Sequence, residues 1–103
     1  MIYNVMISKQ AESDLREIYQ YIADVLLSPE NAEKQINRLE TAIMKLQQFP
    51  KRYKVYQEEP WHSREMRVMP VNNFLIFYIS NDNNNIVTIL RVMYSGCDIS
   101  KNF

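Results

Sequence analysis

Two arginines, Arg67 and Arg91, lie inside stretches that otherwise consist of large apolar side chains with the pattern of β-strands. Burying a guanidinium without a partner is costly, so each arginine either pairs inside the fold or faces a functional surface. Cleavage of RNA by its own 2′-hydroxyl requires proton-transfer groups and cations that stabilise the charged phosphorane. Arg67 and Arg91, with Tyr94 and the single histidine His62, are therefore candidate catalytic residues only if the protein is a ribonuclease.

A structural role for the same residues is the alternative. Arg67 and Arg91 would then pair with Glu65, Asp98 or a loop carbonyl and hold the sheet together, as arginines that interrupt strands often do. A lone loop histidine such as His62 is more often solvated or packed against its neighbours than catalytic.

A second candidate site lies in the segment 51–63, which is polar and aromatic and has no regular period. Cations interleaved with aromatic rings can bind RNA by charge and stacking. The candidate nucleic-acid-binding residues here and just beyond are Lys51, Arg52, Lys54 and Arg64. The alternative is an ordinary solvated loop.

Composition limits the classes of function. Twelve Lys and Arg balance twelve Asp and Glu, which argues against a surface built entirely for nucleic acid. Gly96 is the one glycine, so glycine-rich phosphate loops are excluded and no nucleotide cofactor is expected. Cys97 is the one cysteine, so neither an internal disulfide nor a thiolate metal cluster is predicted. Without a membrane-length apolar run or a signal peptide, the sequence predicts a cytoplasmic protein with no metal and no small-molecule cofactor.

The elements that must position these residues follow from periodicity. Apolar residues at helical spacing predict two helices, interrupted by Ser28-Pro29, which suits the start of the second. We expect a strand at 2–7, helices at 9–27 and 29–48, strands at 64–71, 74–79 and 86–94, and a tail at 95–103. The predicted fold is a single α+β domain, 1–103, with a strand, a two-helix hairpin and a three-stranded antiparallel meander. The hairpin covers one sheet face, and the other face stays partly open beside the loop and the tail.

Several short phrases, in this order and spacing, carry a family resemblance. They are Ala11-Glu12-Ser13-Asp14-Leu15, Leu46-Gln47-Gln48-Phe49-Pro50, Phe74-Leu75-Ile76-Phe77-Tyr78 and the stretch from Ile89 to Asp98. They are spread from residue 11 to residue 98, so the resemblance covers nearly the whole chain. The sequence resembles the RelE/ParE superfamily of toxins from type II toxin–antitoxin systems.

This resemblance implies a toxin that arrests bacterial growth and is held inactive by a cognate antitoxin protein. ParE-like members inhibit DNA gyrase, whereas RelE-like members cleave mRNA on the ribosome. The neutral charge, the long hairpin and the lack of basic or imidazole groups after Tyr94, where Ser95-Gly96-Cys97 stands, favour the ParE-like mechanism. A RelE-like endoribonuclease, and a degenerate toxin that only binds its antitoxin, remain alternatives. Apolar residues of the hairpin are the candidate antitoxin contacts, namely Tyr19, Ile22, Leu26 and Ile36.

Overall fold

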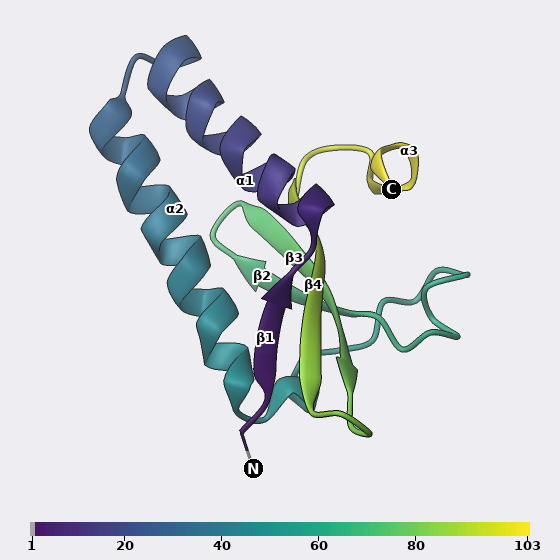
Figure 1. Ribbon diagram of the computed structural model, residues 1–103. Coiled ribbons are helices and arrows are strands. Elements are labelled where there is room, and N and C mark those ends of the chain that lie inside the picture. The colour runs from purple at the N-terminus through teal and green to yellow at the C-terminus, as the bar shows by residue number, and fades with distance from the viewer. Residues whose placement is uncertain (1) are drawn as a thin grey trace.

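The computed structural model describes residues 2–103 and has the predicted order of elements (Figure 1). They are β1 (Asn4–Ile7), α1 (Lys9–Gln20), the π-helical turn η1 (Tyr21–Val25), α2 (Pro29–Met44), the 3₁₀ turns η2 (Lys45–Gln47) and η3 (Pro50–Arg52), β2 (Arg67–Val71), β3 (Phe74–Asn81), β4 (Ile86–Tyr94) and α3 (Ile99–Asn102). The helical hairpin and the three-stranded meander are confirmed, and so is the α+β class.

The sheet has the strand order β1-β4-β3-β2. β1 runs parallel to β4, with Val5 opposite Val87, and the other two pairings are antiparallel. The parallel pairing follows from the helical hairpin, which carries the chain from one end of the sheet back to the other. Asn72 has a φ of 53° in the turn between β2 and β3, as the predicted two-residue asparagine turn requires.

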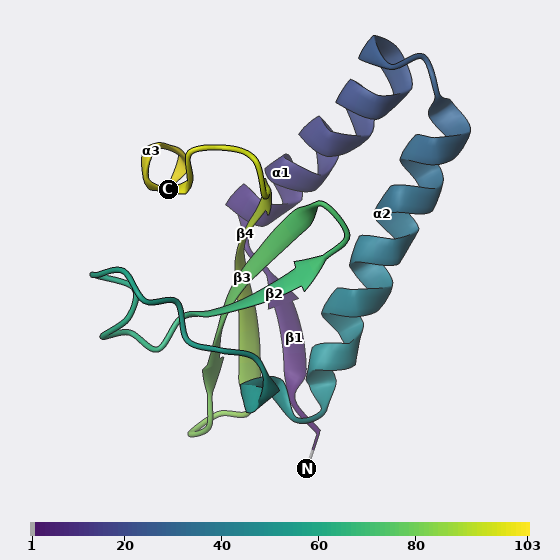
Figure 2. The ribbon, with the colours of Figure 1, turned by 180° about the vertical axis from the view of Figure 1, so that it is seen from behind.

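The two long helices pack against one face of the sheet (Figures 1 and 2). α1 begins where Ser8 caps it, because the Ser8 hydroxyl accepts a hydrogen bond from the Ala11 amide at 3.1 Å. α2 begins at Pro29, as predicted. The core between helices and sheet contains Ala11, Leu39, Ile43, Leu46, Met69, Ile76, Tyr78, Val87, Ile89 and Val92. Within residues 2–103, the helices are too short or too polar to cross a membrane.

The loop and the tail cover part of the opposite sheet face, whereas Met6 on β1 stays 56 % exposed, so this face is partly open as predicted. Met66, Phe77 and Met93 form a second buried cluster beneath the 51–66 loop and the C-terminal tail. Phe103 closes it, with its ring centroid 4.5 Å from that of Trp61 and 5.0 Å from that of Phe77. The strands carry apolar side chains on both faces, and burying them removes apolar surface from water. The tail is therefore part of the packed structure and ends in the short helix α3.

Candidate functional site

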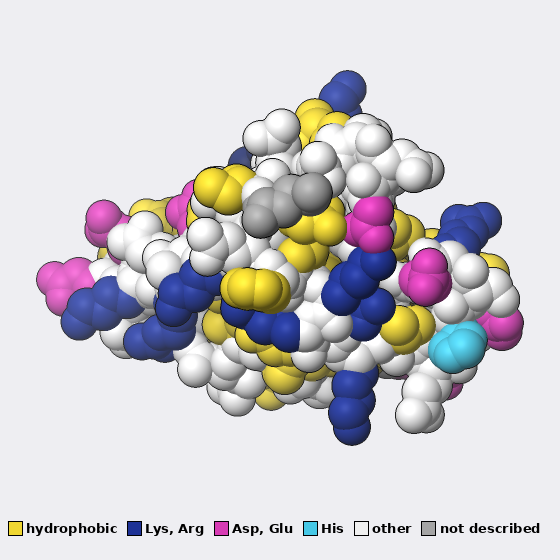
Figure 3. All heavy atoms as spheres, turned by 90° about the horizontal axis from the view of Figure 1, so that it is seen from below, with side chains coloured by type: hydrophobic (Ala, Val, Ile, Leu, Met, Phe, Trp, Pro, Cys, Tyr) yellow, Lys and Arg dark blue, Asp and Glu magenta, His cyan; other side chains and the backbone are white. Residues whose placement is uncertain are grey.

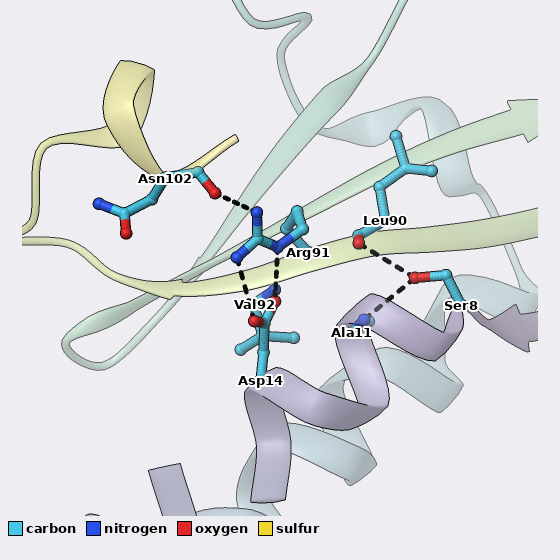
Figure 4. A network of polar contacts seen from close by, with 7 residues as sticks. All are labelled: Ser8, Ala11, Asp14, Leu90, Arg91, Val92 and Asn102. Atoms are coloured by element: carbon cyan, nitrogen blue, oxygen red, sulfur yellow. Dashed lines mark hydrogen bonds and ion pairs between the residues drawn. The ribbon is translucent and has the colours of Figure 1, made fainter. Parts of the chain in front are cut away.

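Arg91 is held by a buried carboxylate on α1 (Figure 4). Asp14 is only 5 % exposed and accepts hydrogen bonds from Arg91 Nε at 2.8 Å, from Arg91 Nη2 at 3.1 Å and from the Val92 amide at 2.9 Å. Arg91 Nη1 also donates to the carbonyl of Asn102, and its guanidinium lies 5.9 Å from the centre of the Phe103 ring. Arg91 therefore joins β4, α1 and the tail in one network.

Sequence reasoning missed Asp14 as the partner of Arg91, since it considered Glu65 and Asp98 instead. A signal was present in the pattern, because Asp14 lies three residues after buried Ala11 and so faces the core along the helix. A carboxylate at a core position needs a buried cation or several donors. The arginine inside a strand and the acid inside an apolar helical stripe therefore neutralise each other's charge and satisfy each other's hydrogen bonds.

Arg67 does not point at an open sheet face. Its Nη1 donates to two backbone carbonyls, those of Lys51 at 3.1 Å and Tyr53 at 2.7 Å. Of the three partners considered for Arg67 from the sequence, the structure therefore contains the loop carbonyl. Tyr78, opposite Arg67 on β3, donates its hydroxyl to the Pro50 carbonyl at 2.5 Å. Arg67 and Tyr78 together fasten the turn around η3 to the sheet.

The buried Tyr78 hydroxyl gives this turn a pH dependence. Burial raises the pKa of Tyr78 from 10.0 to about 12, and the nearby Arg67 opposes the shift only in part. Because the folded pKa exceeds the unfolded one, the stabilisation is complete below pH 10 and is lost as the pH rises towards 12. We expect the free energy of unfolding to fall by about 1.4 kcal/mol per pH unit between these values.

Tyr78→Phe tests that expectation. At neutral pH it should cost about 1–3 kcal/mol, because the Pro50 carbonyl loses its donor. Between pH 10 and 12 its unfolding free energy should fall less steeply than that of the natural chain, measured by urea unfolding. Tyr19→Phe, at an exposed position of α1, is the control. Equal slopes in the natural chain and in Tyr78→Phe would contradict the assignment.

The four candidate nucleic-acid-binding residues are not gathered in one place. Lys51 forms an ion pair with Asp82, and the Tyr3 hydroxyl donates to the same carboxylate at 2.8 Å. The hydrogen bond from Lys51 holds the pKa of Asp82 below its usual range. Arg64 lies apart from these residues, over the Trp61 ring at 5.5 Å. Arg52 and Lys54 are exposed.

The four candidate catalytic residues are also distributed over the molecule. Arg67 lies in a depression with Lys51 and Asp82. Arg91 and the exposed Tyr94 line a different cleft, beside α1. His62 is exposed on the loop, where its amide donates to the Glu58 carbonyl at 3.0 Å. No group of three side chains suited to binding a metal ion occurs within the described residues 2–103.

The cleft beside α1 has a volume of about 710 Å³, and its walls are mainly apolar, with the charged residues Asp14, Glu17 and Arg91 also in its lining. The hairpin contributes one wall and the sheet contributes the other, with lining residues that include Ile18, Tyr21, Ile22, Leu26, Phe74, Met93 and Tyr94. Gln35 also lines it, and its buried amide nitrogen has no hydrogen-bond partner among the described residues.

The structure separates the four candidate antitoxin contacts. Ile22 and Leu26 line the cleft. Tyr19 is exposed on α1 outside it, and Ile36 packs against the helix-covered core. Sequence reasoning missed Gln35 as a cleft residue, because a polar side chain on an amphipathic helix is usually solvated.

The sequence model of the ParE toxin of type II toxin–antitoxin systems, parDE, matches residues 5–98. The chain belongs to the ParE toxin family. It is thus a type II toxin by family, and the match spans the hairpin, the cleft and all four strands from Val5 onwards. No curated protein sequence matches this toxin.

Solved structures share the fold of this ParE-family toxin. The chromosomal ParDE system of Pseudomonas aeruginosa includes a chain with a TM-score of 0.73 and 22 % identity, over 90 % of this chain and 96 % of that one. The RelBE2 toxin–antitoxin complex of Mycobacterium tuberculosis gives a TM-score of 0.62 and 20 % identity, over 91 % and 92 %. A mutant of the Escherichia coli toxin RelE in the free state gives a TM-score of 0.65 and 10 % identity, over 99 % of this chain and 93 % of that one. These similarities extend to both branches of the superfamily, so the fold does not choose between their mechanisms.

Proposed function

We propose that this ParE-family toxin arrests growth by inhibiting DNA gyrase in the cytoplasm, without cleaving RNA, and that a cognate antitoxin neutralises it by occupying the cleft beside α1. The observation that carries the first part is the use of both strand arginines inside the fold. Arg67 donates to two loop carbonyls, and Arg91 pairs with Asp14.

A ribonuclease site needs cations aimed at one reacting phosphate, with an acid and a base within hydrogen-bond reach of it. Arg67 lies in one depression, Arg91 and Tyr94 lie in another, and His62 lies in neither. This separation supports inhibition by binding over catalysis.

Two assays on the same preparation test the proposed target. The chain is made by cell-free translation and added to purified gyrase with relaxed plasmid, and separately to ribosomes translating a defined mRNA. We expect loss of supercoiling at toxin concentrations comparable to those of gyrase, intact mRNA, and recovery of supercoiling when the antitoxin is added. Cleaved mRNA with normal supercoiling would establish the RelE-like alternative. A folded chain with neither effect would establish the degenerate toxin.

The antitoxin part of the proposal rests on the walls of the cleft. Tyr21, Leu26 and Tyr94 are each more than half exposed, although they are large and partly apolar. Contiguous exposed apolar surface marks interaction sites in soluble proteins. The apolar side chains on both walls suit an amphipathic helix that inserts its apolar face.

A further inference from the structure

The outer face of α2 carries a row of cations. Lys34, Arg38, Thr41 and Lys45 follow one another at intervals of three and four residues, so they lie on one face within a sector of about 60°. All four are exposed. The core side chains of the helix, such as Leu39 and Ile43, lie on the opposite side. We call these residues, together with Arg52, the α2 basic stripe.

Arg52 extends the row beyond the end of the helix. Its Nη2 donates to the Lys45 carbonyl at 3.5 Å, which brings the guanidinium of η3 to the C-terminal end of α2. A shallow depression joins the two and is lined also by Glu40, Thr41, Met44, Gln47 and Gln48. Figure 3 looks at this side of the molecule from below and shows Lys and Arg side chains extending across it. Hydroxyl and amide groups lie between these cations, and such groups donate hydrogen bonds to phosphate oxygens.

Folding alone does not account for this arrangement. The chain is neutral overall, yet the segment 34–54 contains six Lys and Arg and a single acid, Glu40. Lys34 and Arg38 stand four residues apart, where like charges destabilise a helix by about 0.2–0.5 kcal/mol. Among residues 2–103, neither they nor Lys45 and Arg52 form an ion pair. Glu40 is the one acid that lines the depression, and among the described residues it forms no ion pair with a stripe cation.

We propose that the α2 basic stripe binds the sugar-phosphate backbone of double-stranded nucleic acid without reading its sequence. From Lys34 to Lys45 the helix rises about 16 Å, a length over which a duplex carries about ten phosphate charges. The stripe itself, at positions 34, 38, 41 and 45, has no apolar side chain to insert into a membrane, and the apolar face of α2 is buried in the core. Cations at regular intervals, with polar groups between them, suit contact with the phosphates of a nucleic-acid backbone. This inference is independent of the proposed target and of the antitoxin cleft.

Salt dependence is the measurement that isolates such contacts. Four cations on phosphates predict a slope of about −3.6 for log K against log salt, so affinity falls about 150-fold between 50 and 200 mM. The triple variant Lys34→Gln/Arg38→Gln/Lys45→Gln keeps good helix formers on α2 and leaves one stripe cation. Its affinity should fall only about 3.5-fold over the same range, from a weaker starting value. Fluorescence anisotropy with labelled 20-base-pair duplexes of DNA and of RNA, titrated with the full chain from cell-free translation, gives both slopes.

The matched control removes three cations elsewhere. Lys9→Gln/Arg16→Gln/Lys101→Gln changes the net charge equally but leaves the stripe intact, and it should keep the steep slope. Circular dichroism and thermal unfolding verify that both variants are folded. Binding of either duplex that weakens only in the stripe variant supports the proposal. Tighter binding of one duplex shows whether the stripe binds the backbone of DNA or that of RNA. Absence of binding to both duplexes, or equal loss in the two variants, would overturn it.

Discussion

Asp14→Ala should destabilise the toxin by about 3–5 kcal/mol, a large part of the total stability of a domain of this size. The carboxylate is nearly fully buried and accepts three hydrogen bonds, two from Arg91 and one from the Val92 amide. Removing it leaves a half-buried guanidinium without its counter-charge and an amide without an acceptor. The loss of partners, more than the worth of the pair itself, makes the effect large.

Urea unfolding of the free chain measures this loss. The antitoxin must be absent, because a ligand that binds only the folded state adds to the apparent stability. Asp24→Ala is the matched control, since it removes an exposed aspartate from the same hairpin and should change stability by no more than about 0.5 kcal/mol. An Asp14→Ala loss as small as that of the control would mean that the carboxylate is not buried in solution.

A double variant tests whether the loss of stability comes from leaving one buried charge without its partner. Asp14→Leu/Arg91→Met replaces both partners with apolar groups and should recover most of the stability lost in Asp14→Ala. The Val92 amide remains without an acceptor, so recovery should stop about 1–3 kcal/mol short.

The helices and strands were predictable because their signals are local. Ser8 and Pro29 mark helix starts, and alternating or helical apolar spacing defines the segments between them. The paired asparagines at 72–73 suit a two-residue turn, and a turn of that length fixes the β2–β3 register. Each of these signals lies within a few residues of the feature that it predicts.

The site was less predictable because its contacts connect distant parts of the chain. Asp14 and Arg91 are 77 positions apart. Each is a charged residue among apolar ones in its own helix or strand, and nothing nearby in the sequence identifies its partner. Phe103 has no periodic context, yet it covers Phe77 and buries part of the second sheet face. The assumption of an open face led Arg67 to be interpreted as a surface cation, when it fastens a turn. Arg67 lies opposite Tyr78 and so shares the helix-covered face of the sheet, which only the strand register reveals.

Leu26→Asp should abolish rescue by the antitoxin while leaving the toxin active. Leu26 lines the cleft at the end of the hairpin with 56 % of its surface exposed, so an aspartate is tolerated in the free toxin. In the complex the new carboxylate would be covered by apolar surface, and an unpaired buried charge is strongly unfavourable. We expect antitoxin affinity to fall about 100-fold, or roughly 3 kcal/mol, within the range of single interface hot spots.

Leu27→Asp provides the control at the next position. Leu27 is 82 % exposed, does not line the cleft, and has a φ of 53°, a backbone conformation that Asp accepts more readily than Leu. It adds the same charge at the same end of the hairpin and should keep full rescue. The measurements are growth after co-expression with the antitoxin and titration calorimetry of the purified pair. If both variants were rescued equally, the antitoxin would bind elsewhere; if both escaped rescue, charge at the hairpin tip, and not the cleft wall, would be responsible.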